Sequence, residues 1–186
     1  MPYRLLLIPL LMVLGACQST MELDYDPTRD FAAYRSWSWQ EPAVRYRPDD
    51  PVIKSDLTEQ RIREAVGQQL EQRGLRQATR GQADLKVQAW FSVERRQDSY
   101  TTYYGGMFMG YPNGWWGGPS YAQTNTYDYR VGILQVDLLD GRDGRLVWRG
   151  SDEQVLSRGQ QSPSERATLI RETAARVLSQ YPPRAR

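Results

Sequence analysis

The sequence predicts an α+β fold: a mainly antiparallel sheet with two amphipathic helices packed on one face. Two segments, near residues 56–74 and 162–181, carry apolar residues at helical spacing. Residues 85–94 alternate apolar and polar side chains, which is typical of a strand with one buried face. Runs of strands accompanied by two such helices favour an α+β class. A long Gly- and aromatic-rich loop is expected between two long strands.

The first elements are short. A strand is expected at Leu23–Asp26, and the proline that follows stops it. Residues 30–39 are expected to form a tight connection and then a short strand, with Trp37 and Trp39 on one face. Residues 41–52 are polar and rich in proline, so they are interpreted as a surface loop.

Both helices have start signals. Asp56 is the expected N-cap of the first helix, where Glu59 completes a capping box, and Gly74 is the expected left-handed C-cap. Ser162 is the expected N-cap of the second helix, with Pro163 at the first helical position. The apolar stripes are Leu57, Ile62, Ala65, Val66 and Leu70 in the first helix, and Ala167, Ile170, Ala174, Val177, Leu178 and Tyr181 in the second.

The long strands follow from period-two patterns. Residues 85–94 give the clearest one. A second long strand is expected at Tyr127–Leu139, and its apolar phase slips beside Gly132. A β-bulge or burial on both faces would explain the slip. Residues 140–144 have the composition of a turn and residues 145–149 return as a strand, so a hairpin is expected.

The segment between the long strands is the best functional candidate. Residues 99–127 contain no charged side chain, many glycines and nine aromatic residues. Clustered Tyr and Trp offer large contact areas with a polar tip, and long loops of this kind are often functional. Three interpretations stay open: contact with a protein, glycan or lipid surface, an insert with no partner, or a loop folded back over the sheet. The candidate interaction residues are Tyr103, Tyr104, Phe108, Tyr111, Trp115, Trp116 and Tyr121.

The N-terminus has the layout of a secretory signal. Arg4 and the free amine provide a positive start, residues 5–14 form an apolar run, and Gly15 and Ala16 are small. The run is shorter than the roughly 20 residues that a spanning helix needs. Residues 1–16 are therefore interpreted as a signal peptide, with a buried N-terminal helix as the alternative.

The amino-acid composition excludes several kinds of catalytic and metal-binding site. The sequence has no histidine and one cysteine, Cys17, which excludes Ser-His-Asp triads, Cys-His dyads, His-ligated metals and internal disulfides. Without Arg4, the 24 basic residues become 23, scattered among 22 acidic ones, so no nucleic-acid partner is expected. We expect no metal and no cofactor. Residues 23–183 are expected to form one domain, between a tether at 17–22 and a tail at 184–186.

The residues Leu14–Cys17 resemble the lipobox of bacterial lipoproteins. The resemblance implies cleavage before Cys17, a thioether-linked diacylglycerol and an acylated amine. Gln18 stands where an aspartate would favour the inner membrane, so the resemblance implies an outer-membrane anchor with the domain in the periplasm. Each buried CH₂ contributes about 0.8 kcal/mol, and three chains would hold the protein on a membrane.

The mature chain also resembles a bacterial lipoprotein family catalogued as domain of unknown function 4136. Members often carry a Gly- and Tyr-rich insert between two long strands, as residues 99–127 do here. The resemblance implies an envelope location and an α+β domain, and it brings no activity and no catalytic residue. The matching residues are Asp24–Asp26, Asp30, Phe31, Tyr34, Trp37, Trp39, Leu70, Gly74, Leu75, Ala83–Leu85, Val136, Leu138, Asp140 and Leu146–Gly150.

These observations predict a non-enzymatic binding or structural module of the cell envelope that uses its aromatic loop on an envelope protein or glycan. An envelope assembly factor and a glycan-acting enzyme are the alternatives. For the enzyme, Asp24 and Asp26 show no convergence with a second carboxylate across a cleft. The Asp140-x-x-Asp143 pattern lacks the further ligands of a Ca²⁺ loop, so it is interpreted as a turn. Two candidates remain. Trp148–Gly150 is interpreted as a packed tryptophan at a strand end, and Arg95–Arg96 as a solvated strand end.

Overall fold

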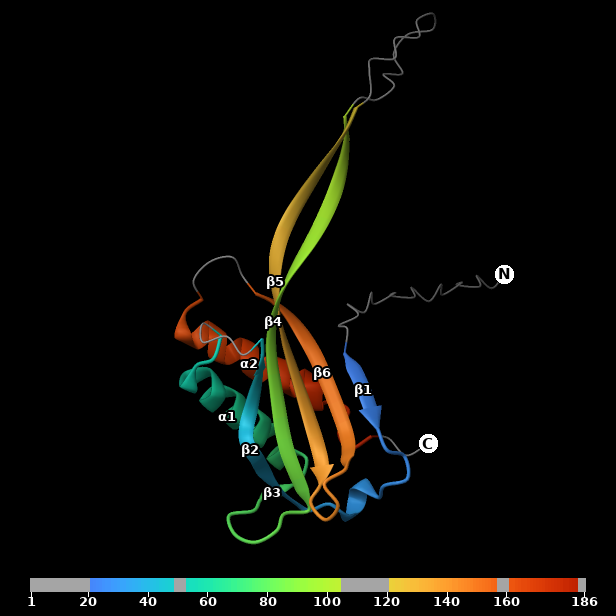
Figure 1. Cartoon of the computed structure of the whole chain (residues 1–186), viewed down its shortest axis with the longest axis vertical. Coiled ribbons are helices and arrows are strands. Elements are labelled where there is room, and N and C mark those ends of the chain that lie inside the picture. The colour runs from blue at the N-terminus through green and yellow to red at the C-terminus, as the bar shows by residue number, and fades with distance from the viewer. Residues whose placement is uncertain (1–20, 49–52, 105–120, 157–160, 184–186) are drawn as a thin grey trace, which may run out of the picture.

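The computed structural model describes residues 21–48, 53–104, 121–156 and 161–183. They form a six-stranded sheet in the order β1-β6-β5-β4-β2-β3, with two α-helices and a short 3-10 helix, η1 (Figure 1). The elements are β1 Glu22–Tyr25, η1 Phe31–Ala33, β2 Ser36–Arg47, α1 Asp56–Gln72, β3 Arg76–Gln77, β4 Leu85–Tyr104, β5 Tyr121–Asp140, β6 Leu146–Leu156 and α2 Pro163–Leu178.

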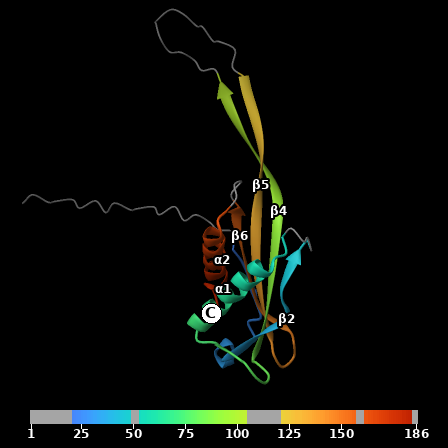
Figure 2. The same ribbon diagram turned by 90° about the vertical axis from the view of Figure 1, so that its left-hand side faces the viewer.

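The layers follow the apolar faces of the elements. Figure 2 shows both helices on the same side of the sheet, while β4 and β5 continue together well beyond the body. The helices bury one stripe each, and the strands bury the alternate residues that face them. The α+β class is therefore confirmed.

The sheet is mixed, so the expectation of a mainly antiparallel sheet is wrong at one side. β2 runs parallel to β4 and to β3, whereas β4, β5, β6 and β1 pair antiparallel. The reason is the position of α1 between β2 and β4 in the chain. A helix between two strands carries the chain back across the sheet, and the second strand then runs in the direction of the first.

β2 also extends through a predicted loop. Residues 41–47 belong to the strand, although the prolines of the segment 41–52 predict a surface loop. The register between β2 and β4 shifts between Trp39 and Val44, and Pro42 lies in that interval, where the lack of an N–H does no harm. Val44 and Tyr46 are buried, which fixes the second half of the strand.

The two helix starts differ. At α2, Ser162 Oγ accepts from the Glu165 N–H and the Glu165 carboxylate accepts from the Ser162 N–H, so the predicted N-cap is confirmed and forms a capping box. At α1 the N-cap is Ser55, one residue before the prediction, and its side chain makes no cap bond. Gly74 after α1 has φ of 86°, as its expected C-cap role requires.

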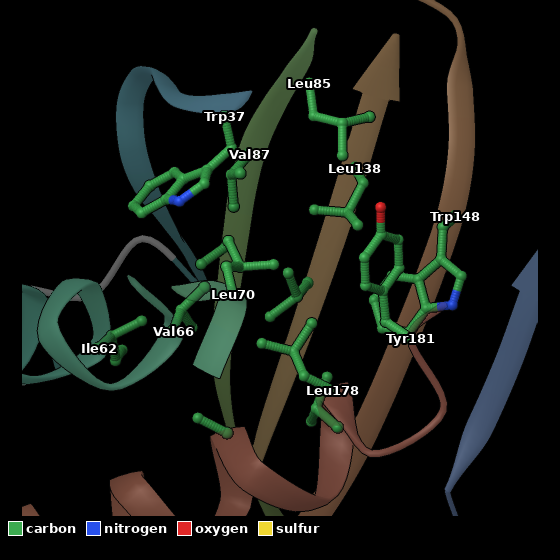
Figure 3. Packing of buried hydrophobic residues seen from close by; sticks show 14 of the residues in the cluster. Trp37, Ile62, Val66, Leu70, Leu85, Val87, Leu138, Trp148, Leu178 and Tyr181 are labelled. Carbon is green, nitrogen blue, oxygen red and sulfur yellow. The ribbon is translucent and has the colours of Figure 1, made fainter. Parts of the chain in front are cut away.

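The core lies between the helices and the sheet (Figure 3). Trp37 and Trp148 are its largest buried side chains, exposed by 1% and 0%. The Trp148 ring meets Tyr181 edge-on at 5.7 Å between centroids. A Cβ on Gly150 would lie 2.5 Å from the Trp148 ring, so the strand accepts this tryptophan only because residue 150 is glycine. The packed-strand interpretation of Trp148–Gly150 is confirmed.

The phase slip near Gly132 reflects burial on both faces. Val131 and Leu134 lie on opposite faces of β5, and both are buried. The ladder with β4 runs through this point without a shift. The irregularity in β5 lies elsewhere, between Leu138 and Leu139 in its pairing with β6.

Candidate functional site

The candidate site is a two-stranded arm that projects from the sheet. β2 ends where Arg47 pairs with Ser92, and β6 ends where Leu156 pairs with Arg130. Beyond these points, and among the described residues, Arg96–Tyr104 of β4 and Tyr121–Tyr129 of β5 pair only with each other, over nine residue pairs. We call these two segments the arm. At about 3.4 Å per residue, the arm is about 27 Å long (Figure 1).

The arm corrects the predicted loop. Residues 99–104 and 121–127 are strand, so the expectation of a loop over 99–127 is wrong at both ends. Among the candidate interaction residues, Tyr103, Tyr104 and Tyr121 lie on the arm. The others, namely Phe108, Tyr111, Trp115 and Trp116, lie outside the described residues.

One face of the arm is lined with tyrosines. Directly paired residues share a face, and faces alternate along each strand. The pairing therefore places five tyrosines on one face, which we call the tyrosine face: Tyr100, Tyr104, Tyr121, Tyr127 and Tyr129. The candidate interaction residues predicted from the sequence do not include Tyr100, Tyr127 and Tyr129. The even spacings of Tyr121, Tyr127 and Tyr129 are the signal of a strand face.

The tyrosine face is exposed and partly preassembled. Tyr104 and Tyr121 stack with ring centroids 5.1 Å apart and planes 19° apart. Tyr127 lies 6.3 Å from Tyr100 and 6.1 Å from Tyr129. Tyr121 is 62% exposed and Tyr100 is 56% exposed. The rings therefore form a largely exposed row, in which the Tyr127 hydroxyl donates to Asp98 at 3.0 Å.

The opposite face is small and polar. It carries Tyr103, which is 80% exposed, among threonines and other short polar side chains. Thr101 and Thr124 hydrogen-bond across the strands at 2.9 Å, and Gln97 donates to Asp128 at 3.1 Å. These contacts hold the two strands together without a hydrophobic layer.

The base of the arm is charged. Arg96 pairs with Glu153 of β6 at 2.8 Å and with Glu94 at 3.4 Å, and the hydrogen bond to Glu153 raises the pKa of the Arg96 guanidinium. Arg95 points to the other face, where it is exposed and lies opposite Arg130. The two arginines that the sequence singled out together therefore have different surroundings.

The carboxylates that the sequence singled out take part in turns. Asp140 is fully buried and is held by Arg29, Tyr34 and Arg142, while Asp143 pairs with Arg29 at 2.7 Å. The turn interpretation is confirmed. Within the described segments, no three His, Cys, Asp or Glu side chains gather in a way that could hold a metal ion.

Asp24 and Asp26 do not share a site. Asp26 accepts from the Thr28 hydroxyl and N–H, and these bonds lower its pKa. Asp24 pairs in register with Arg149, whose guanidinium binds Asp137 through two bonds of 2.7 Å. Both carboxylates therefore lie beside cations.

These features define a small α+β protein with a projecting, tyrosine-faced ribbon. The chain belongs to the family described as Domain of unknown function (DUF4136), which matches residues 21–183. No curated protein matches the sequence. None of the helices within the described segments is long and apolar enough to cross a membrane.

Solved structures share the fold at low identity. A PDZ domain protein from Parabacteroides distasonis is 14% identical, covers 89% of this chain and has a TM-score of 0.54. This chain spans 36% of that protein. The PelC dodecamer from Paraburkholderia phytofirmans is 14% identical, with coverage of 87% of this chain and 95% of that one and a TM-score of 0.46. A minor lipoprotein from Acinetobacter baumannii is 13% identical, with coverage of 79% and 91% and a TM-score of 0.33. The likeness to the first of these structures concerns the fold alone.

Proposed function

We propose that this chain is a lipid-anchored protein of the cell envelope that works by binding, and that the arm is its contact surface. The observation that carries the proposal is the tyrosine face, which stands on a ribbon that pairs with no other described strand. The proposal assigns no reaction to the protein.

An isolated two-stranded ribbon is only marginally stable in water, and its two edges present unpaired N–H and C=O groups. A partner that covers the tyrosines or adds a strand would stabilise the arm and use both features. Tyrosine is also among the residues that most often dominate binding energy at protein interfaces. A protein partner is therefore favoured, with a glycan or a lipid surface as the alternatives.

The proposed anchor would place the arm near the membrane. β4 and β6 run toward the arm, whereas β1 runs away from it, so Glu22 is the arm-side end of β1. Cys17 lies five residues before Glu22, and an extended chain of that length spans at most about 18 Å. Glu22 pairs with Ser151, midway along β6, so a lipid on Cys17 would be attached on the arm side of β1. The proposal places the anchor in the outer membrane and the domain in the periplasm.

The surroundings of the buried carboxylates favour a binding role over a hydrolytic one. Each of the buried carboxylates Asp137, Asp140 and Asp152 accepts a bond from an arginine. A general acid needs a raised pKa, and the Arg142 guanidinium instead holds the pKa of Asp140 well below its usual range. A glycan-acting enzyme therefore remains the weaker alternative.

Photo-crosslinking in living cells tests the proposal. A photoreactive residue in place of Tyr121 should give a discrete protein adduct, because that side chain lies on the tyrosine face. The same residue in place of Gln68, which is exposed on α1, should give none. An adduct of much greater mass would favour the assembly factor. Equal labelling from both positions, or none from Tyr121, would overturn the proposed role of the arm.

A second experiment addresses the glycan alternative. The Cys17→Ser protein is sedimented with purified peptidoglycan, and a variant with Tyr104→Ser and Tyr121→Ser serves as the comparison. Sedimentation that depends on the two tyrosines would make glycan the partner and would contradict a protein partner. Sedimentation of neither protein would be the expected result.

A further inference from the structure

A second potential site lies in the body, away from the tyrosine face. A cavity of about 270 Å³ opens between the first turns of α1 and α2 and the helix-facing side of β4, β5 and β6. Its wall is mainly aliphatic and aromatic. The apolar residues that define it are Ile62, Phe91, Val93, Leu134, Leu169 and Ile170.

Two arginines stand at this cavity with no counter-ion among the described residues. Arg130 of β5 and Arg166 of α2 both line it, and both are exposed. In the described segments, the carboxylates that form ion pairs do so with other cations, and none lies within 4 Å of either guanidinium. An apolar cavity with two unpaired cations is suited to a ligand that has an apolar body and a negative head.

The positive charge has two further sources. Arg95 is the direct cross-strand neighbour of Arg130 on the same face, and like charges in that position repel. The N-termini of both helices also lie at the cavity, since Thr58 of α1 and Arg166 of α2 line it, and helix N-termini favour anions. An anion bound here would reduce the repulsion between Arg95 and Arg130 and would interact favourably with the dipoles of both helices.

The acidic groups nearby are already engaged. Glu165 accepts from the Ser162 N–H at 2.7 Å in the capping box, and Glu59 lies 3.7 Å from Arg63. The polar wall is ordered as well, because Gln154 accepts from Arg176 at 2.8 Å. The two charged side chains that line the cavity itself are both arginines.

We propose that this cavity binds an anionic single-chain amphiphile, with its carboxylate or phosphate head on Arg130 and Arg166 and its alkyl chain among the apolar residues. The volume is close to the lower end of the roughly 300–1,000 Å³ that small-molecule sites occupy, which favours a ligand with a single alkyl chain. The inference is independent of the arm, since the cavity residues lie in the body.

Calorimetric titration tests this site in the full chain carrying Cys17→Ser, which leaves residues 21–183 unchanged. Dodecanoate and dodecyl phosphate, both below their micelle concentrations, are the probes. Dodecyltrimethylammonium and dodecanol have the same chain with a cationic or a neutral head. We expect binding of the anions and much weaker binding of the other two. The anion that binds with the higher affinity identifies the preferred head group as carboxylate or phosphate.

Substitutions localise the binding. Arg130→Gln with Arg166→Gln should weaken binding of the anionic probes at least about tenfold, because it removes two charged hydrogen-bond donors. Arg171→Gln, on the same helix outside the cavity, should leave the affinity unchanged. Val93→Trp should abolish binding by filling the cavity.

Three outcomes would overturn the inference: no binding of either anion, equal binding of the cationic probe, or equal affinity in the double-arginine variant and the Arg171→Gln control. Unfolding midpoints confirm that each variant is folded. If Val93→Trp fails to fold, the comparison of the four probes and the Arg130→Gln, Arg166→Gln variant still test the inference. Both arginines are exposed, so they can be replaced without disturbing the core.

Discussion

At the scale of single residues, Asp140 shows how a turn is fixed from a distance. Its Oδ2 accepts from the Tyr34 hydroxyl at 2.9 Å and from Arg29 at 3.1 Å, and its side chain is fully buried. The hydrogen bond from Arg142 holds the pKa of this carboxyl well below its usual range. Burial and the bond to Asp140 raise the pKa of Tyr34 to about 12. One carboxylate thus joins the β5–β6 turn to the chain between β1 and β2.

We expect Asp140→Asn to lower the free energy of unfolding at pH 7 by about 1.5 to 3 kcal/mol, since it weakens several charged hydrogen bonds. The loss should depend on pH. Because the folded pKa lies below the unfolded value of about 3.9, the contribution of Asp140 is complete above that pH. It declines as the pH falls further toward the folded pKa.

Urea unfolding of both proteins at pH 7, 5, 4 and 3 measures this effect. The difference between wild type and variant should be constant at pH 7 and 5 and smaller at pH 3. A difference that is the same at pH 3 would show that the charge of Asp140 does not stabilise the fold.

The same residue shows what a local pattern can predict. The Asp and Gly residues of 140–144 predict a turn, and the turn forms. Arg29, which neutralises Asp140, lies 111 residues away in sequence, and no spacing rule connects the two. Local backbone chemistry was therefore predictable, and the electrostatic partner was not.

At the scale of elements, the two helix starts offer a matched pair. Ser162 caps α2 with its side chain, whereas Ser55 stands at the same position of α1 without a side-chain cap bond. An N-cap serine that accepts a backbone bond typically contributes about 1 kcal/mol. The two serines should therefore differ although their places in the helices are the same.

Ser162→Ala should lower the free energy of unfolding by about 1 kcal/mol, and Ser55→Ala by less than about 0.5 kcal/mol. Denaturant unfolding of the two variants, compared with wild type at one pH, gives both values. Equal losses would mean that the Ser162 side-chain bond contributes nothing beyond the backbone preference of serine at an N-cap.

The strands show where periodicity is informative. Residues 85–94 were predicted from apolar alternation because one face of that segment meets the helices. The outer halves of β4 and β5 pair with no other described strand, so they carry Tyr, Thr and other polar residues and resemble a loop in composition. The second half of β2 was missed for another reason: the prolines of 41–52 predict a loop, and a register shift interrupts the strand pattern between Trp39 and Val44.

At the scale of the whole molecule, three features lie toward one end of the sheet. The arm continues β4 and β5, the amphiphile cavity lies at its base, and the arm-side end of β1 leads to Cys17. The candidate site was predictable as an aromatic segment, but its tyrosine face required the strand register. The cavity had no signature in sequence, since its walls come from two helices and three strands. A lipid anchor at this end would bring both surfaces to the membrane.

The anchor itself gives the last prediction. Cys17→Ser should leave residues 21–183 folded and move the protein from the membrane to the soluble fraction, because the acyl chains are the proposed attachment. Gln18→Asp provides a matched change beside it. By the lipobox resemblance, that variant should stay lipidated and move to the inner membrane. Density-gradient separation of the two membranes, with mass spectrometry of the mature N-terminus, measures both. Sedimentation of the Cys17→Ser protein with the outer membrane would show that the domain, through its arm or another surface, holds the protein there without lipid.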